Sequence, residues 1–282
     1  MSIYMWRKPW PLCFTANTAN STVQLTKTWT PTSVTLETST NWTSWSSYTI
    51  GDTITLTNIW DKVYFRNKSE TDTWFSTGYS DRYRFVMSGS ISSSGDVTSL
   101  LNKNGTLTLS DFCFYSLFRE CSLTTSPELP ATTLAQSCYW GMFVLCAWLT
   151  TSPELPATTL AAYCYSNMFV GSGVSTAPEL PATTLAAYCY YSMFQRTPLT
   201  ILPKLPATTL PQACYAYMFQ QCSNIKLSTT QTWDYQTAYR IPTTWTGSAW
   251  SYGLDGMFTS TWWTFTGTPS INTTYYTNNT LV

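Results

Sequence analysis

Short segments in which apolar and polar residues alternate fill the first third of the chain. Alternation with a period of two is typical of strands that bury one face. Strands at close, even spacing favour a small antiparallel sandwich. The pattern therefore predicts a β-rich N-terminal domain over residues 1–98. The expected strands lie at Val23–Lys27, Ser33–Glu37, Thr53–Thr57, Lys62–Arg66 and Arg82–Met87.

A second pattern recurs four times between residues 126 and 219. Each copy opens with Pro-Glu-Leu-Pro-Ala-Thr-Thr-Leu, or with Lys in place of Glu, and continues into Cys-Tyr-x-x-Met-Phe. An earlier block, Cys113–Phe118, supplies a fifth unit without the proline-rich lead-in. A fixed period in this range indicates stacked structural repeats. The first cysteines of the units are 25 or 26 residues apart, at Cys113, Cys138, Cys164, Cys189 and Cys214.

One repeat predicts one strand and one short helix. Val174–Leu180 alternates as a strand does, and its proline limits pairing to the residues before Pro178. Leu185, Cys189 and Met193 then fall at i, i+4 and i+8, one face of two helical turns. A unit of this size buries its apolar face only against its neighbours. We therefore expect an α+β solenoid over residues 99–227, with the 26-residue step absorbed in a loop at Ala147–Trp148.

The repeat resembles the BspA-like leucine-rich repeats, through Leu-Pro-Ala-Thr-Thr-Leu followed by Cys-Tyr-x-x-Met-Phe, over residues 107–227. Such repeats occur in bacterial surface proteins and in phages that infect gut bacteria. The resemblance implies a curved leucine-rich-repeat solenoid with a β-sheet on one face and short helices on the other. It also implies recognition rather than catalysis, and a β-domain ahead of the repeats.

The rest of the chain joins and closes these parts. The Ser- and Gly-rich stretch 88–104 predicts a junction, and residues 228–282 predict a Thr/Trp/Tyr-rich capping segment with a degenerate echo of the repeat at Leu254–Phe258. Several tryptophans stand in turn-like clusters where backbone chemistry favours glycine. They are open to three interpretations: aromatic contacts to sugars or partners, partial burial, or a recoded stop codon translated as tryptophan. These residues are Trp42, Trp60, Trp245, Trp262 and Trp263.

Composition narrows the function. Lys plus Arg equals Asp plus Glu at 14 each, so nothing marks the chain as a binder of nucleic acid or anionic membrane. With no histidine, the chain lacks the commonest general base and the Ser-His-Asp arrangement. No apolar run reaches the length of a membrane span. The first residues make a poor signal peptide, which fits release by host lysis better than secretion.

The nine cysteines predict buried thiols rather than disulfides or a metal site. Three units carry a second cysteine eight residues after the first, but Ser172 and Thr197 stand at that position in the other two. A cross-link on which the unit depended would not lose one partner so freely. We expect no metal and no cofactor, since Cys-x-x-Cys spacing is absent.

Two surfaces are candidates for binding. Alternation counted from Glu128 predicts an outward sheet face, whose lattice also includes Ala177 and Leu202. The carboxylates of Glu128, Glu154 and Glu179 would stack on adjacent strands, either as a solvated face or, less expected, as a glycosidase pair. The second surface is a tyrosine column, which could equally be packing between repeats. The face comprises Thr124, Ser126, Glu128, Thr150, Ser152, Glu154, Ser175, Glu179, Thr200 and Lys204, and the column Tyr139, Tyr165, Tyr190 and Tyr215.

We therefore expect a non-enzymatic recognition or adhesion protein whose solenoid binds a cell-surface protein or glycan. The expected setting is extracellular, on a phage virion or tail, with a bacterial surface adhesin as the alternative. A purely structural virion protein is a further alternative, and other virion proteins are then candidate partners.

Overall fold

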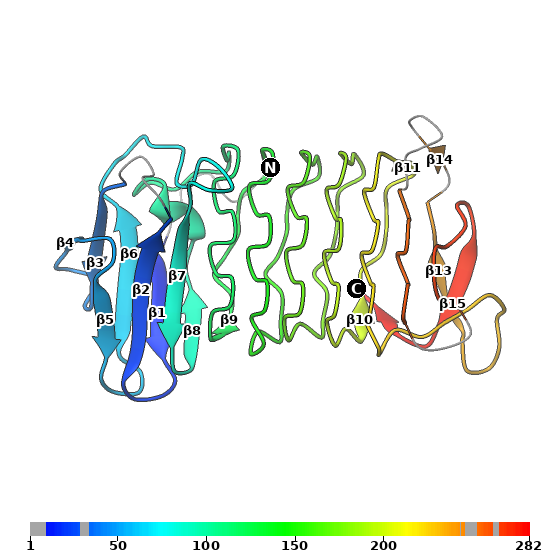
Figure 1. The fold of residues 1–282 in the computed structure, drawn as a ribbon, viewed down its shortest axis with the longest axis horizontal. Coiled ribbons are helices and arrows are strands. Elements are labelled where there is room, and N and C mark those ends of the chain that lie inside the picture. Colours follow the sequence, from blue (N-terminus) through cyan, green and yellow to red (C-terminus); the bar gives the residue numbers. More distant parts are fainter. Residues whose placement is uncertain (1–9, 29–33, 243, 246–252, 262–264) are drawn as a thin grey trace.

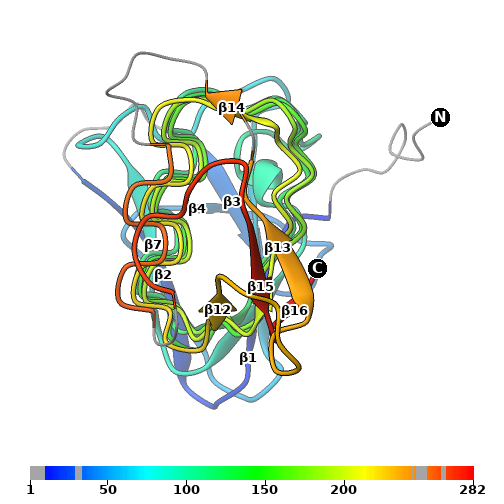
Figure 2. The same ribbon diagram turned by 90° about the vertical axis from the view of Figure 1, so that its right-hand side faces the viewer.

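The computed structural model describes residues 10–28, 34–242, 244–245, 253–261 and 265–282. It is an elongated stack (Figure 1): a β-sandwich forms one end, single-chain coils follow one another along the long axis, and the C-terminal segment covers the other end. Viewed along that axis, successive coils superpose (Figure 2).

The N-terminal sandwich has two antiparallel sheets that share a core. Rings from both sheets meet there: Phe14 lies 4.9 Å and Phe65 5.3 Å from Phe85, measured between ring centroids. All five expected strands form, although β3 begins only at Leu36. One sheet has the order β4-β3-β6-β1-β8 and continues into β9, and the other has the order β5-β2-β7. The strands are β1 Leu12–Ala16, β2 Ser21–Lys27, β3 Leu36–Ser39, β4 Ser46–Tyr48, β5 Thr53–Leu56, β6 Lys62–Asn67, β7 Tyr83–Ser88 and β8 Ile91–Ser94.

The sandwich and the coils are one continuous structure. The stretch 88–104 contains β8 and the 3-10 turn η2 (Val97–Leu100), where the Asp96 side chain accepts a hydrogen bond from the Thr98 N–H. Strand β8 pairs in parallel with β9 (Leu123–Thr125), the first strand of the repeats. The sheet of the sandwich thereby extends into the solenoid.

The prediction of a short helix in each repeat is wrong. The described residues form β-strands, bridges, turns and irregular segments, and η2 is their only helical segment. Where Leu185–Phe194 was expected to be helical, the backbone forms consecutive turns, with Tyr188 and Ser192 at φ of 59° and 51°. The fold is therefore an all-β coil stack rather than an α+β solenoid.

These turns form a regular face, which we call the turn ladder (residues 112–121, 137–146, 163–172, 188–197 and 213–222). A left-handed residue recurs every fourth position, as at Ser137, Gly141 and Leu145. Between them, N–H groups bond alternately within the coil and to the next coil: Met142 donates to the Tyr139 carbonyl at 3.2 Å, and Phe143 to the Met168 carbonyl at 2.9 Å. Each coil thus satisfies its backbone partly through its neighbour.

The interior of the coils is built from aromatic columns. The rings of Tyr139, Tyr165, Tyr190 and Tyr215 stack at 5.6–5.8 Å. A parallel column of phenylalanines runs from Phe85 of β7 to Phe258 in the C-terminal segment, with successive centroids 5.4–5.9 Å apart. The column joins sandwich, repeats and C-terminal segment in a single core, consistent with the continuous cluster of buried residues.

The C-terminal segment adds one further coil and covers it. The echo at Leu254–Phe258 continues the turn ladder, because Tyr217 and Phe219 donate to the carbonyls of Asp255 and Met257 at 2.8 and 3.0 Å. Strands β12 and β13 pair with β15, β10 pairs with β16, and β11 with β14. Their bounds are β10 Ile201–Leu202, β11 Thr209–Leu210, β12 Leu227–Ser228, β13 Thr237–Arg240, β14 Thr244–Trp245, β15 Thr274–Thr277 and β16 Thr280–Leu281.

Candidate functional site

The side of the coils opposite the sequence Cys-Tyr-x-x-Met-Phe carries the prolines, and we call it the proline face (residues 123–132, 149–158, 174–183 and 199–208). In the two middle repeats, pairing on this face stops before the proline: Thr151 bridges to Thr176, and Thr176 to Ile201. At the two ends of the face it continues past the proline, because Glu128 bridges to Asp96 and the Lys204 N–H donates to the Val282 carbonyl. The expectation that the strand pairs only ahead of the proline therefore holds at Pro153 and Pro178, where the missing proline N–H ends the ladder, and is wrong at Pro127 and Pro203.

Beyond these bridges the coils separate. Within the described residues, segments 153–158 and 178–183 make no backbone–backbone hydrogen bond, in contrast to the turn ladder on the same coils. Their peptide N–H and C=O groups are therefore left for solvent or a ligand, since such groups must be satisfied.

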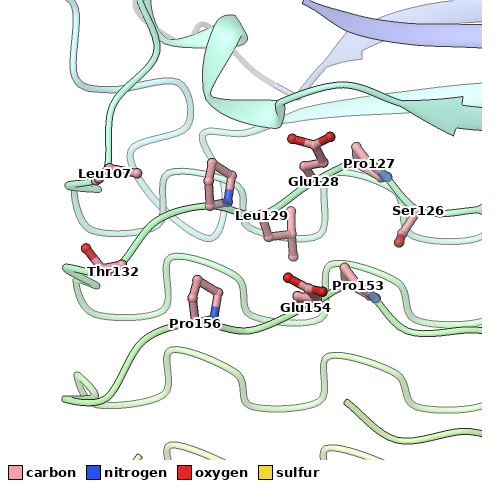
Figure 3. A pocket seen from close by; sticks show the side chains of 10 residues that line it. Leu107, Ser126, Pro127, Glu128, Leu129, Thr132, Pro153, Glu154 and Pro156 are labelled. Carbon is pink, nitrogen blue, oxygen red and sulfur yellow. The ribbon is translucent and has the colours of Figure 1, made fainter. Parts of the chain in front are cut away.

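A groove of about 560 Å³ lies between the first two proline-rich coils (Figure 3). Glu128 and Glu154 stand on its successive coils, between proline rings. A second groove, of about 440 Å³, follows between the next two coils and includes Glu154 and Glu179. The first groove is lined by Leu107, Ser126, Pro127, Glu128, Leu129, Pro130, Thr132, Pro153, Glu154 and Pro156.

The structure exposes or half-exposes all ten residues expected on the outward face. Ser126, Glu128, Ser152, Glu154 and Glu179 line the two grooves. The other five, Thr124, Thr150, Ser175, Thr200 and Lys204, are solvent-accessible outside them. The same alternation also predicted that Ala177 and Leu202 face outward, and this is wrong. Both residues are buried, at 2% and 0% exposure.

A buried carboxyl lies next to the first groove. Asp96 is only 8% exposed and bridges to Glu128 in the sheet. Burial, together with the charge of Glu128, raises the pKa of Asp96 to about 6, although the Thr98 N–H, 2.7 Å from Asp96 Oδ1, opposes the shift. The Asp96 N–H itself donates to the Trp10 carbonyl.

The expected tyrosine column is not a surface. Tyr139, Tyr165, Tyr190 and Tyr215 are at most 1% exposed and form the core column described above. They pack between repeats, which was the alternative interpretation, because the four-residue turn directs both the Cys and the Tyr of each block inward. Burial raises the pKa of each of these tyrosines well above its ordinary value.

The cysteines are buried free thiols, as expected: all nine are unpaired and none exceeds 4% exposure. The second cysteine of a unit acts as a small hydrogen-bond donor. Cys222 Sγ donates to the Phe194 carbonyl at 2.9 Å, and the Thr197 hydroxyl donates to the same oxygen at 2.7 Å. The two bonds differ in kind, because the cysteine donates to the preceding coil and Thr197 donates within its own coil. Burial raises the pKa of the Cys222 thiol to about 11.

The turn tryptophans do occupy strained positions. Trp42 and Trp60 have φ of 69° and 75°, the left-handed region that favours glycine. Trp60 is 73% exposed, whereas Trp42 packs against Trp10 and Tyr64. Trp262, Trp263 and the side chain of Trp245 lie outside the described residues. The contacts of Trp42 were not anticipated from the sequence.

Two further features concern the described residues: clusters that could bind a metal ion and helices that could span a membrane. No group of three or more acidic or cysteine side chains in the described part of the chain is arranged to hold a metal ion. None of its helical segments has the length and apolarity needed to cross a membrane. Comparisons with family models, curated proteins and solved structures found no significant match.

Proposed function

We propose that this protein is a non-enzymatic recognition protein that binds a cell-surface protein or glycan along its proline face, in an extracellular setting such as a phage virion or a bacterial surface. The observation that carries the proposal is the pair of grooves on that face. They combine proline rings, carboxylates and backbone groups that make no hydrogen bond to a neighbouring coil.

These groove features suit an extended ligand. The unpaired peptide groups can form hydrogen bonds with the hydroxyls or the backbone of a ligand. The proline rings provide apolar contact, and the carboxylates favour ligands that carry hydrogen-bond donors. Because the coils repeat, the same set of groups recurs along the long axis, from Glu128 through Glu154 to Glu179. A repeating or extended partner would meet a matching series of contacts, as in other stacked-repeat proteins.

The test is saturable binding of the purified protein to whole gut-bacterial cells and to their extracted surface glycans. The double variant Glu154→Arg with Glu179→Arg should weaken binding at least tenfold, because both changes alter groove charges. Asp234→Arg, an exposed acidic position in the C-terminal segment, is the matched control and should bind as the parent does.

Two outcomes would contradict the proposal. Equal binding by the double variant and the parent would move the site away from the proline face. No binding to any cell or glycan, together with a defined oligomer in solution, would favour a structural virion role instead.

A further inference from the structure

An aromatic cluster lies on the outer face of the N-terminal sheet. The indole of Trp42 sits 5.1 Å from that of Trp10, inclined by 48°, and 5.2 Å from the Tyr64 ring, nearly perpendicular to it. Trp10 is 55% and Trp42 38% exposed. Because the two indoles are inclined rather than stacked, they form an open corner with accessible ring surface.

The loop that presents Trp42 is held in place. It joins β3 to β4, and Asn41 Oδ1 accepts hydrogen bonds from the N–H groups of Thr43 and Ser44 at 3.0 and 2.9 Å. The Trp45 indole N–H donates to the Trp42 carbonyl at 3.1 Å. Trp42 itself has a left-handed backbone, a conformation that residues with a Cβ rarely adopt. Strain of this kind at an exposed aromatic residue points to a function.

The rim of the cluster is polar and electrically balanced. The Arg66 guanidinium lies 3.8 Å from the centre of the Trp45 ring, and its Nε and Nη2 both donate to Glu37 Oε2, at 3.1 and 3.0 Å. Both charged side chains are partly buried, so the pair is fixed. It supplies hydrogen-bonding groups without adding net charge.

We propose that Trp10, Trp42, Trp45 and Tyr64 form a binding site for a neutral carbohydrate, which goes beyond the function proposed for the solenoid. A pyranose ring carries C–H groups on its faces and hydroxyls around its edge. Its faces match the exposed indoles, and its edge matches the Arg66–Glu37 pair. The internal neutralisation of Arg66 removes the positive charge that a nucleic acid or a sulfated glycan requires.

The site is independent of the grooves. Its residues belong to the segment before β1, to the β3–β4 loop and to β6, whereas the grooves are built from residues of the coils. Loss of one site therefore leaves the other intact, and the two proposals fail separately.

Titration calorimetry and tryptophan fluorescence with neutral hexasaccharides test the proposal. The probes are cellohexaose, xylohexaose, mannohexaose and chitohexaose, each at 50 and 500 mM salt. We expect saturable binding of at least one probe, little changed by salt because the ligand is neutral. Trp10→Ala and Trp42→Gly should each weaken it at least tenfold. Glycine suits the left-handed backbone at position 42, so this variant keeps its fold, which a thermal melt checks.

Trp148→Ala and Trp233→Ala are the controls, since these tryptophans are 68% and 83% exposed but lie on other parts of the molecule. They should bind as the parent does, and so should the groove variant Glu154→Arg with Glu179→Arg. The proposal is overturned if the parent binds none of the four probes, or if binding survives both Trp10→Ala and Trp42→Gly.

Discussion

At the scale of single residues, the junction between sandwich and coils contains an unfavourable carboxyl. Asp96 is buried, and the charged side chain that acts on it, Glu128, carries the same sign of charge. Its side chain is kept because Oδ1 caps η2 through the Thr98 N–H. A neutral acceptor would serve this cap equally well.

Asp96→Asn should therefore stabilise the protein at neutral pH. The folded carboxyl has a pKa of about 6, against about 4 in an unfolded chain, so folding takes up a proton between these values. The free energy of unfolding of the parent then falls as pH rises from 4 to 6, by up to about 3 kcal/mol. Urea unfolding of parent and variant at pH 4, 5, 6 and 7 measures this.

Asp96→Asn should remove most of the fall in the free energy of unfolding between pH 4 and 6, and it should raise the stability at pH 7. Asp234→Asn, at an exposed site, should leave the profile as it is in the parent. Parallel profiles for Asp96→Asn and the parent would show that the buried carboxyl is not responsible.

At the scale of elements, much of the N-terminal sheet could be predicted and the coil could not. Alternation located β2, β5, β6 and β7 closely, because a sandwich strand has one buried face. The helix prediction for the coils failed because a spacing of four residues fits both structures. Leu185, Cys189 and Met193 have the spacing of two helical turns, and the turn ladder has the same period. Two glycines distinguish the turn ladder from a helix. Gly141 and Gly171 stand at left-handed positions of the turns, whereas glycine is unfavourable inside a helix.

The same difference explains the outcome for the candidate sites. On the proline face the backbone is extended, and alternation placed Glu128, Glu154 and Glu179 correctly outside. In the turn ladder two neighbouring residues point inward together, so the aromatic residue that follows each first cysteine, phenylalanine in the first unit and tyrosine in the other four, is buried with it. The cluster around Trp42 depends on a loop folding over a sheet, which no local pattern encodes.

Substitutions at left-handed positions should change the stability in opposite directions in a turn ladder and in a helix. Gly141→Ala should cost about 1 kcal/mol or more, because φ is 59° and the added Cβ would meet Ser116 Oγ and Val144 Cγ2 at 3.3 Å. Ser192→Gly, at the equivalent place two coils on, should be neutral or stabilising. In a helix both signs would be reversed. Chemical denaturation measures both, and reversed signs would refute the ladder.

At the scale of the whole molecule, stability is shared along the stack. Each coil contacts its neighbours through alternate backbone bonds and through the Tyr and Phe columns. The phenylalanine column begins at Phe85 in the sandwich and ends at Phe258 in the C-terminal segment, so it links the coils to both flanking parts. Such an arrangement predicts a cooperative chain in which coils are interchangeable as long as their register is kept.

Removing one coil tests this interchangeability. Deleting residues 165–189 removes 25 residues and joins Cys164 to Tyr190, so the block Cys-Tyr-x-x-Met-Phe is restored. We expect the shortened protein to fold with the same far-UV circular dichroism per residue and to unfold in one transition, with lower stability because one interface between coils is lost. Deleting residues 165–188 removes 24 and leaves Cys189 directly after Cys164. That change moves every later left-handed position by one residue and exchanges the N–H groups that bond within and between coils, so this variant should not reach a cooperative fold. Equal behaviour of the two deletions would mean that packing of the aromatic columns, rather than backbone register, holds the coils together.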